Sequence, residues 1–184
     1  MKKKEAFTIG HSTRSTQEFL EILNAYDIET VVDIRHYPGS RYCPQFNKEV
    51  MKDYLFESGI EYIHLLDLGG RRKADKNSLL NNGWRSAQFR GYADYMQTKE
   101  FAQGLEKLMK IIEKRTVAFM CSEAVPWRCH RSMVADALTV NGIKVLDIFD
   151  QKKVQIHKLT PFAVKKNKTV IYPNPEEKGE LHEL

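Results

Sequence analysis

The chain has 184 residues, of which 42% are hydrophobic and 29% charged, a composition typical of one soluble globular domain with a substantial core. No apolar run approaches the roughly 18 residues of a membrane span, and the start MKKKEAFTIGHS lacks the apolar segment and cleavage site of a secretory signal. We therefore expect a cytoplasmic protein with no membrane partner, whose three cysteines are reduced thiols. The formal net charge of +5 is compatible with an anionic partner.

Strand-like and helix-like patterns alternate along the chain. Short apolar runs predict strands at 6–10, 30–35, 60–66, 116–120 and 143–149. Amphipathic patterns with capping residues predict helices at 15–26, 47–59, 92–96, 100–114 and 130–142. This order predicts a single α/β domain over residues 1–160, with a mostly parallel open sheet and helices on both faces. We expect residues 161–184 to form a small C-terminal appendage, either a hairpin or a flexible tail.

Four loops are expected at the carboxyl edge of this sheet, and they hold nearly all the chemically reactive side chains. They are GHSTRS, DIRHYPGSRYCPQFN, the segment from His64 to Met96, and CSEAVPWRCHR. The loops expected at the opposite edge, such as YDIETV, ESGIEY and NGIKV, are plain connectors. Because ligands of open α/β sheets bind at the carboxyl edge, this asymmetry predicts a functional site there.

In the loop CSEAVPWRCHR we expect the catalytic residues to be Cys121, Glu123 and His130. A cysteine at the end of a buried strand is by default a small core residue. Here the N-terminus of the following helix and the cations Arg128 and Arg131 favour an activated thiolate or an anion-binding loop instead. Six residues separate Cys121 from Arg128, one more than in the loop of cysteine phosphatases and rhodanese-type enzymes, so phosphatase chemistry is the minority interpretation. Glu123 fits either a general acid or base, or a carboxylate that neutralises the arginines.

Cys121, Cys129 and His130 are also residue types that bind zinc. Structural zinc sites usually use close pairs of ligands, such as cysteines separated by two to four residues, and no second pair of this kind is present in the sequence. We therefore predict no metal site and assign Cys129 to ligand binding. The sequence leaves any cofactor unknown.

Further ligand-binding residues are expected in the carboxyl-edge loops. They are His11, Ser12, Asp33, Arg35, Arg41, Arg71, Arg90, Tyr92, Arg128 and Arg131. Arginines in loops can hold a carboxylate or phosphate through two parallel hydrogen bonds. Asp33 and Arg35 fit an internal ion pair equally well, and Tyr92 fits a packing residue. The loop from Asp67 to Arg90 is long for a compact domain, which predicts a lid or binding segment.

Several of these segments form an ordered set of blocks, namely TIGHST, DIRHYPGSR, Leu68 to Gly70, FRGYADYM, CSEAVPWRCHR and HKLT. In this order and at these distances they resemble the signature of the DUF488 family, over residues 6–160. The resemblance implies a cytosolic, prokaryotic-type α/β domain with a suspected enzymatic role, and it supplies no substrate. Cys43 departs from the family pattern, so we do not count it among the site residues.

Two functions remain open. The first is an enzyme that acts on a small anionic or nucleotide-like substrate through a Cys, Glu, His and Arg site. The second is a non-catalytic protein that binds nucleic acid or a nucleotide, with arginines on phosphates and aromatic side chains on bases. We favour the enzyme, because a thiol, a carboxylate and an imidazole add nothing to binding driven by charge. The sequence does not define the oligomeric state.

Overall fold

A central six-stranded sheet forms the frame of the molecule. The computed structural model describes residues 4–177, so the last seven residues of the predicted appendage, 178–184, lie outside the described part of the chain. The strand order is β3-β2-β4-β1-β5-β6. The strands are β1 (Glu5–Gly10), β2 (Thr30–Asp33), β3 (Glu61–His64), β4 (Val117–Cys121), β5 (Lys144–Ile148) and β6 (Val154–Ile156). The first five pair in parallel and β6 runs antiparallel to β5, so the predicted mostly parallel sheet is confirmed.

Five helices connect and cover these strands. They are α1 (Thr16–Ala25), α2 (Lys48–Glu57), α3 (Ala87–Tyr95), α4 (Lys99–Ile112) and α5 (Arg131–Val140). The N-termini of α1, α3 and α4 are capped as the sequence favours, because the hydroxyls of Ser15, Ser86 and Thr98 accept hydrogen bonds from backbone N–H groups in the first turn. No helix among residues 4–177 is long and apolar enough to cross a membrane.

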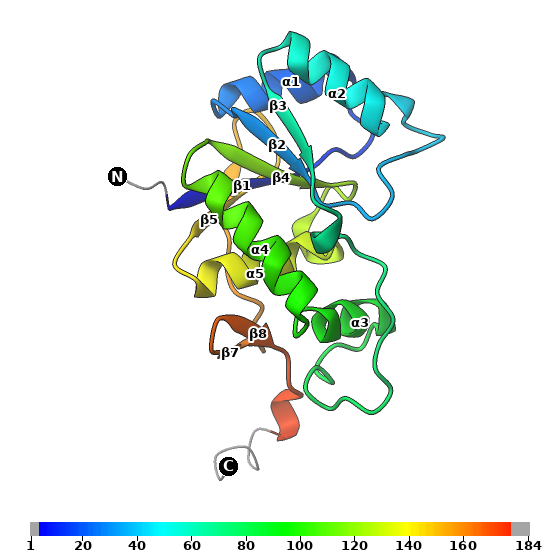
Figure 1. Ribbon diagram of the computed structural model, residues 1–184, viewed down its shortest axis with the longest axis vertical. Helices are drawn as coiled ribbons and strands as arrows, with labels where there is room; N and C mark the ends of the chain where they lie inside the picture. The colour runs from blue at the N-terminus through cyan, green and yellow to red at the C-terminus, as the bar shows by residue number, and fades with distance from the viewer. Residues whose placement is uncertain (1–3, 178–184) are drawn as a thin grey trace.

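The helices lie on both faces of the sheet, as predicted (Figure 1). On one face α1 and α2 bury an apolar layer that includes Phe19 and Leu55. On the other face α3, α4 and α5 bury a second layer that includes Phe101 and Leu138. Strands β2, β4 and β1 lie between the two layers, and β2 and β4 are buried along their whole length. Central strands buried on both faces are what a parallel sheet requires.

The C-terminal appendage packs against the domain through a buried polar network. Its two short strands, β7 (Val164–Lys166) and β8 (Thr169–Ile171), form an antiparallel hairpin. Beyond the hairpin, the buried Tyr172 donates its hydroxyl to Asp136 of α5 at 2.9 Å. Asp136 also contacts His157 at 2.8 Å and accepts from the Thr160 hydroxyl at 2.7 Å. One fully buried carboxylate therefore holds the chain after β6 onto helix α5.

The strand register brings three predicted site residues to one edge. Gly10 lies opposite Cys121 in the pairing of β1 with β4, and Asp33 lies opposite Met120 in the pairing of β2 with β4. His11, Arg35 and the residues after Cys121 therefore leave the sheet side by side at its carboxyl edge. Their predicted convergence is confirmed by the parallel pairing of these strands.

Candidate active site

The loops after β1 and β4 cross in close contact. The backbone N–H of His11 donates to the Cys121 carbonyl, and that of Ser12 donates to the Ser122 carbonyl, both at 2.9 Å. Gly10 makes this crossing possible, because a Cβ atom at this position would lie 1.7 Å from the backbone oxygen of Glu123. The glycine of the GHST segment is therefore required by a close approach of two backbones.

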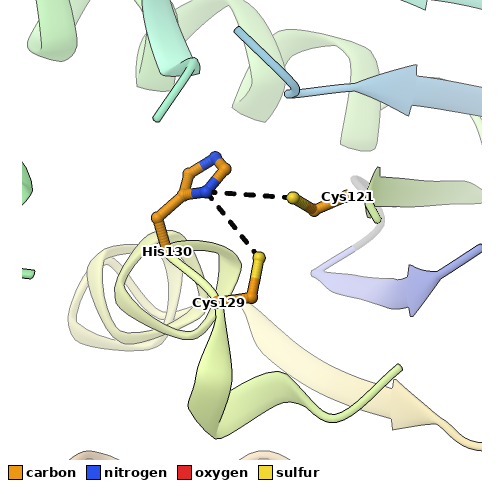
Figure 2. Close-up of side chains that lie close together, drawn as sticks. All are labelled: Cys121, Cys129 and His130. Atoms are coloured by element: carbon orange, nitrogen blue, oxygen red, sulfur yellow. Dashed lines mark hydrogen bonds between the residues drawn. The ribbon is translucent and has the colours of Figure 1, made fainter. Parts of the chain in front are cut away.

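Beyond this crossing, Cys121, Cys129 and His130 form a compact cluster (Figure 2). Cys121 ends β4, Cys129 follows a short 3-10 helix (Pro126–Arg128), and His130 caps α5. The Nδ1 atom of His130 lies 3.9 Å from the Cys121 sulfur and 3.7 Å from the Cys129 sulfur. Both thiols are almost fully buried, with exposed fractions of 6% and 4%.

A backbone contact fixes the orientation of the His130 ring. Its Nε2 atom lies 2.9 Å from the carbonyl oxygen of Ile34, and a carbonyl can only accept, so the hydrogen is on Nε2. In the neutral ring Nδ1 then presents a lone pair to the two sulfurs. Tyr92 packs against the ring at a centroid distance of 4.8 Å, and its hydroxyl donates to the Leu68 carbonyl at 2.7 Å. The alternative interpretation of Tyr92 as a packing residue therefore agrees with its buried position.

The two thiols of the cluster ionise as a coupled pair. A hydrogen bond from Cys129 and the nearby His130 hold the pKa of the Cys121 thiol well below its ordinary value, against the opposing effect of burial. Burial and the contact with Cys121 raise the pKa of Cys129 well above its ordinary value. The first proton therefore leaves readily and the second with difficulty, and the negative charge is centred on Cys121.

A buried ion pair forms the neighbouring wall. The Arg35 guanidinium donates to both carboxylate oxygens of Asp33, from Nε at 2.9 Å and from Nη2 at 2.6 Å. Tyr62 donates its hydroxyl to the same carboxylate at 2.6 Å. Asp33 and Arg35 therefore form the internal ion pair that the sequence offered as an alternative to ligand binding.

The remaining Nη1 of Arg35 lies 3.2 Å from Nε2 of His11, whose Nδ1 donates to the Ser12 carbonyl at 2.8 Å. Burial is the main cause that lowers the pKa of His11 to about 4, and the charge of Arg35 adds to it. His11 is therefore neutral near pH 7, and two fixed contacts set its tautomer.

These groups line a cavity of about 420 Å³ at the carboxyl edge. Nine of the fourteen predicted site residues contribute to its wall, namely His11, Arg35, Arg71, Tyr92, Cys121, Glu123, Arg128, Cys129 and His130. Arg71, Glu123 and Arg128 are exposed at the rim, whereas the thiols and His11 lie deeper. The cavity joins the four predicted loops into one concave surface.

The family model of DUF488, a domain of unknown function, matches residues 15–138. The chain belongs to the DUF488 family. The matched segment runs from the N-terminus of α1 into α5 and includes the Cys121, Cys129 and His130 cluster, whereas His11 precedes it. No curated protein and no solved structure matches the chain. Membership of the DUF488 family therefore identifies no substrate for this pocket.

Arg131, one of the predicted ligand-binding residues of this DUF488 protein, lies outside the cavity. Its side chain is fully buried behind the loop and does not line the cavity. It donates to the hydroxyl of Thr8 at 3.2 Å and to the carbonyls of Glu123 and Ala124 at 2.9 and 3.0 Å. The structure therefore places Arg131 away from the cavity that it was expected to line. As the first residue of α5, it points back toward β1 and supports the loop from behind.

Ser12, Arg41 and Arg90 also lie outside the cavity lining. The backbone of Ser12 is used in the loop crossing, at a φ of 52°. Arg41 is exposed in the loop before the 3-10 helix at Pro44–Phe46. Arg90 sits on α3 and donates to the Trp84 carbonyl at 3.2 Å. The structure does not bring these three residues to the cavity wall, because proximity in a loop sequence does not define which way a side chain points.

The cavity also contains residues outside the predicted set of site residues. They are His36, Tyr37, Gly39, Ser40, Gly70, Gln88, Phe89 and Ser122. For Gly70 the signal in the sequence is the glycine itself, because a Cβ atom at this position would lie 2.9 Å from Nδ1 of His130. The LGG segment therefore gives the His130 ring room beside the thiols.

Proposed function

We propose that the protein is an enzyme that acts on a small anionic substrate, such as a nucleotide or another phosphate-bearing or carboxylate-bearing molecule, in the carboxyl-edge cavity. One observation carries this proposal. A single cavity of about 420 Å³ combines two thiols, three imidazoles and a carboxylate with three arginines. That volume lies in the range of small-molecule sites, about 300–1,000 Å³.

The groups divide by depth into two roles. Arg71 and Arg128 are exposed at the rim, where a guanidinium is free to rotate toward the negative charge of a substrate. Cys121 and His130 lie at the floor as the reacting groups, and Glu123 at the rim is placed to exchange protons with solvent. His11 and the Arg35 ion pair are held by fixed hydrogen bonds, so this wall keeps its shape when the substrate enters.

The same arrangement favours a small molecule over a nucleic acid. A nucleic acid is bound by cations spread along an extended surface, and its affinity falls steeply with salt. Here Arg35, Arg71 and Arg128 converge on one concavity. Thiols and an imidazole at its floor have no task in binding phosphates through charge alone.

Titration calorimetry with pyrophosphate and adenosine monophosphate tests the proposal. Arg128→Ala should weaken binding by about tenfold or more, because losing a hydrogen bond to a charged group costs about 1.5–3 kcal/mol. Lys166→Ala is the matched control, since it also removes one exposed cation but lies in β7, away from the cavity. Equal affinities for the two variants would contradict the proposal, and tighter, strongly salt-dependent binding of a single-stranded oligonucleotide would favour the nucleic-acid alternative.

A further inference from the structure

We propose that Cys121, Cys129 and His130 bind a zinc ion whose fourth coordination position faces the cavity. These three residues each offer one ligand atom, and the atoms all lie within 4.8 Å of one another. Two sulfurs and one imidazole nitrogen form a donor set that zinc uses in catalytic sites, with the remaining position left to water or substrate. What the ion would do there rests on the proposed function, whereas its binding rests on the geometry of the cluster.

The separations between the ligand atoms are close to those of a tetrahedral site. With Zn–S bonds of about 2.3 Å and a Zn–N bond of about 2.0–2.1 Å, the tetrahedral angle places sulfur about 3.6 Å from nitrogen. The sulfurs of Cys121 and Cys129 lie 3.9 and 3.7 Å from Nδ1 of His130. These two sulfur–nitrogen distances therefore need to shorten by only a few tenths of an ångström, and the two sulfurs, which lie within 4.8 Å of each other, would be about 3.8 Å apart in a tetrahedral site.

A second, independent observation concerns the far side of the His130 ring. Histidines that bind metals almost always donate their other ring N–H to a carbonyl or carboxylate, which fixes the ring and directs the lone pair at the ion. His130 has this contact, because its Nε2 lies 2.9 Å from the Ile34 carbonyl. Nδ1 is therefore the atom free to coordinate, and it is the atom that points at both sulfurs, as Figure 2 shows.

Charge balance favours the same conclusion. Two thiolates at nearly buried positions are costly unless a cation neutralises them. A divalent ion bound by two thiolates and a neutral imidazole gives a site of zero net charge, with the two thiol protons released to solvent. Such an ion would supply a Lewis acid, or a bound water of lowered pKa, next to the arginines that hold the substrate.

Metal binding by the purified full-length chain tests this inference. After treatment with a chelator and a reductant, the protein should take up about one equivalent of Zn²⁺, measured by equilibrium dialysis with elemental analysis. Co²⁺ in place of Zn²⁺ should give the visible bands of a tetrahedral site and a thiolate-to-cobalt charge-transfer band. Cys129→Ser should weaken Zn²⁺ binding by more than the tenfold to hundredfold typical for loss of an outer-shell partner.

Two further variants make the result specific. Cys43→Ser is the matched control, because Cys43 is also a buried free cysteine but lies outside the cluster, and it should bind Zn²⁺ like the wild type. Gly70→Ala keeps all three ligands but places a Cβ atom 2.9 Å from Nδ1 of His130. It should lower the affinity by about tenfold or more, on the scale of an outer-shell change, and this test remains if Cys129→Ser fails to fold.

Uptake of less than about a tenth of an equivalent, or equal affinity in Cys129→Ser and Cys43→Ser, would overturn the inference. So would a disulfide between Cys121 and Cys129 that persists in the reduced preparation. Repeating the pyrophosphate titration on metal-free protein separates the two proposals. Anion binding without zinc uptake would support the proposed function and contradict the metal site. Zinc uptake without any anion binding would support the metal site and contradict the proposed function.

Discussion

Gly10→Ala is the sharpest test of how the site is built. Gly10 is the last residue of β1, and its neighbour across the sheet is Cys121. A Cβ atom would lie 1.7 Å from the Glu123 backbone oxygen, whereas real Cβ contacts essentially never fall below 3.0 Å. The two backbones must therefore separate by at least 1.3 Å, the difference between these distances. No change of a side-chain rotamer relieves a clash with a backbone atom.

The separation would stretch the two hydrogen bonds of the loop crossing. His11 and Ser12 donate to the loop after β4 at 2.9 Å, and both bonds would exceed hydrogen-bonding distance after such a shift. Each bond contributes about 0.5–1.5 kcal/mol, and leaving its groups unpaired costs somewhat more. We expect a loss of about 3 kcal/mol in unfolding free energy, which for a domain of this size lowers the melting temperature by roughly 6–12 °C.

Thermal melts of Gly10→Ala and Gly39→Ala give the comparison. Gly39 also lies at the carboxyl edge, but a Cβ atom there would meet only the side chain of Asn47, at an ordinary 3.7 Å. Gly39→Ala should therefore melt within a degree or two of the wild type. If Gly10→Ala melted at the same temperature as Gly39→Ala, the close crossing of the two loops would be wrong, and with it the position of Cys121 in the cavity.

Three further expectations concern His157, Arg131 and Tyr92. Burial opposes the charge on His157, but its contacts with Asp136 and Asp147 outweigh burial and raise its pKa to about 9. Because the imidazole of the unfolded chain titrates near 6.5, this stabilisation is full below about pH 6.5 and is lost as the pH rises to about 9. The melting temperature should therefore fall more between these two pH values for the wild type than for His157→Gln. Arg131→Met keeps much of the side-chain volume but removes the donors to the loop carbonyls, and should lower the melting temperature by several degrees. Tyr92→Phe leaves a buried carbonyl without its hydroxyl donor and should cost about 1–3 kcal/mol in denaturant unfolding.

The frame of the fold was predictable because its signals are local. Short apolar strands of four to six residues alternate with amphipathic helices, and this alternation specifies a parallel sheet. One strand escaped prediction, and one helix is longer than predicted. Strand β6 (Val154–Ile156) has three residues, all exposed, so its apolar pattern is too short to predict a strand. Helix α3 begins at Ala87, five residues before the predicted start, because the segment around Gly91 has a weak apolar stripe and a cap at Ser86.

The composition of the site was predictable only in part. Parallel strands bring their carboxyl ends together, so the meeting of His11, Arg35 and Cys121 follows from the fold class. The direction in which each arginine side chain points does not follow from the fold class, because it depends on packing between segments far apart in sequence. Arg128 and Arg131 are three residues apart, yet Arg128 is exposed at the cavity and Arg131 is fully buried against Thr8 of β1.

The spacing rule for zinc ligands does not detect the proposed cluster of Cys121, Cys129 and His130, for a structural reason. It looks for pairs of ligands separated by two to four residues, because a tight turn returns such pairs to one ion. In this fold the turn is replaced by a change of backbone conformation, since Cys129 is extended, with φ −137° and ψ 146°, and His130 is helical, with φ −58° and ψ −18°. Adjacent side chains that would diverge within a helix or strand can therefore face one point. The third proposed ligand, Cys121, comes from the end of β4, so its proximity to the other two is set by the sheet and is not visible in the spacing.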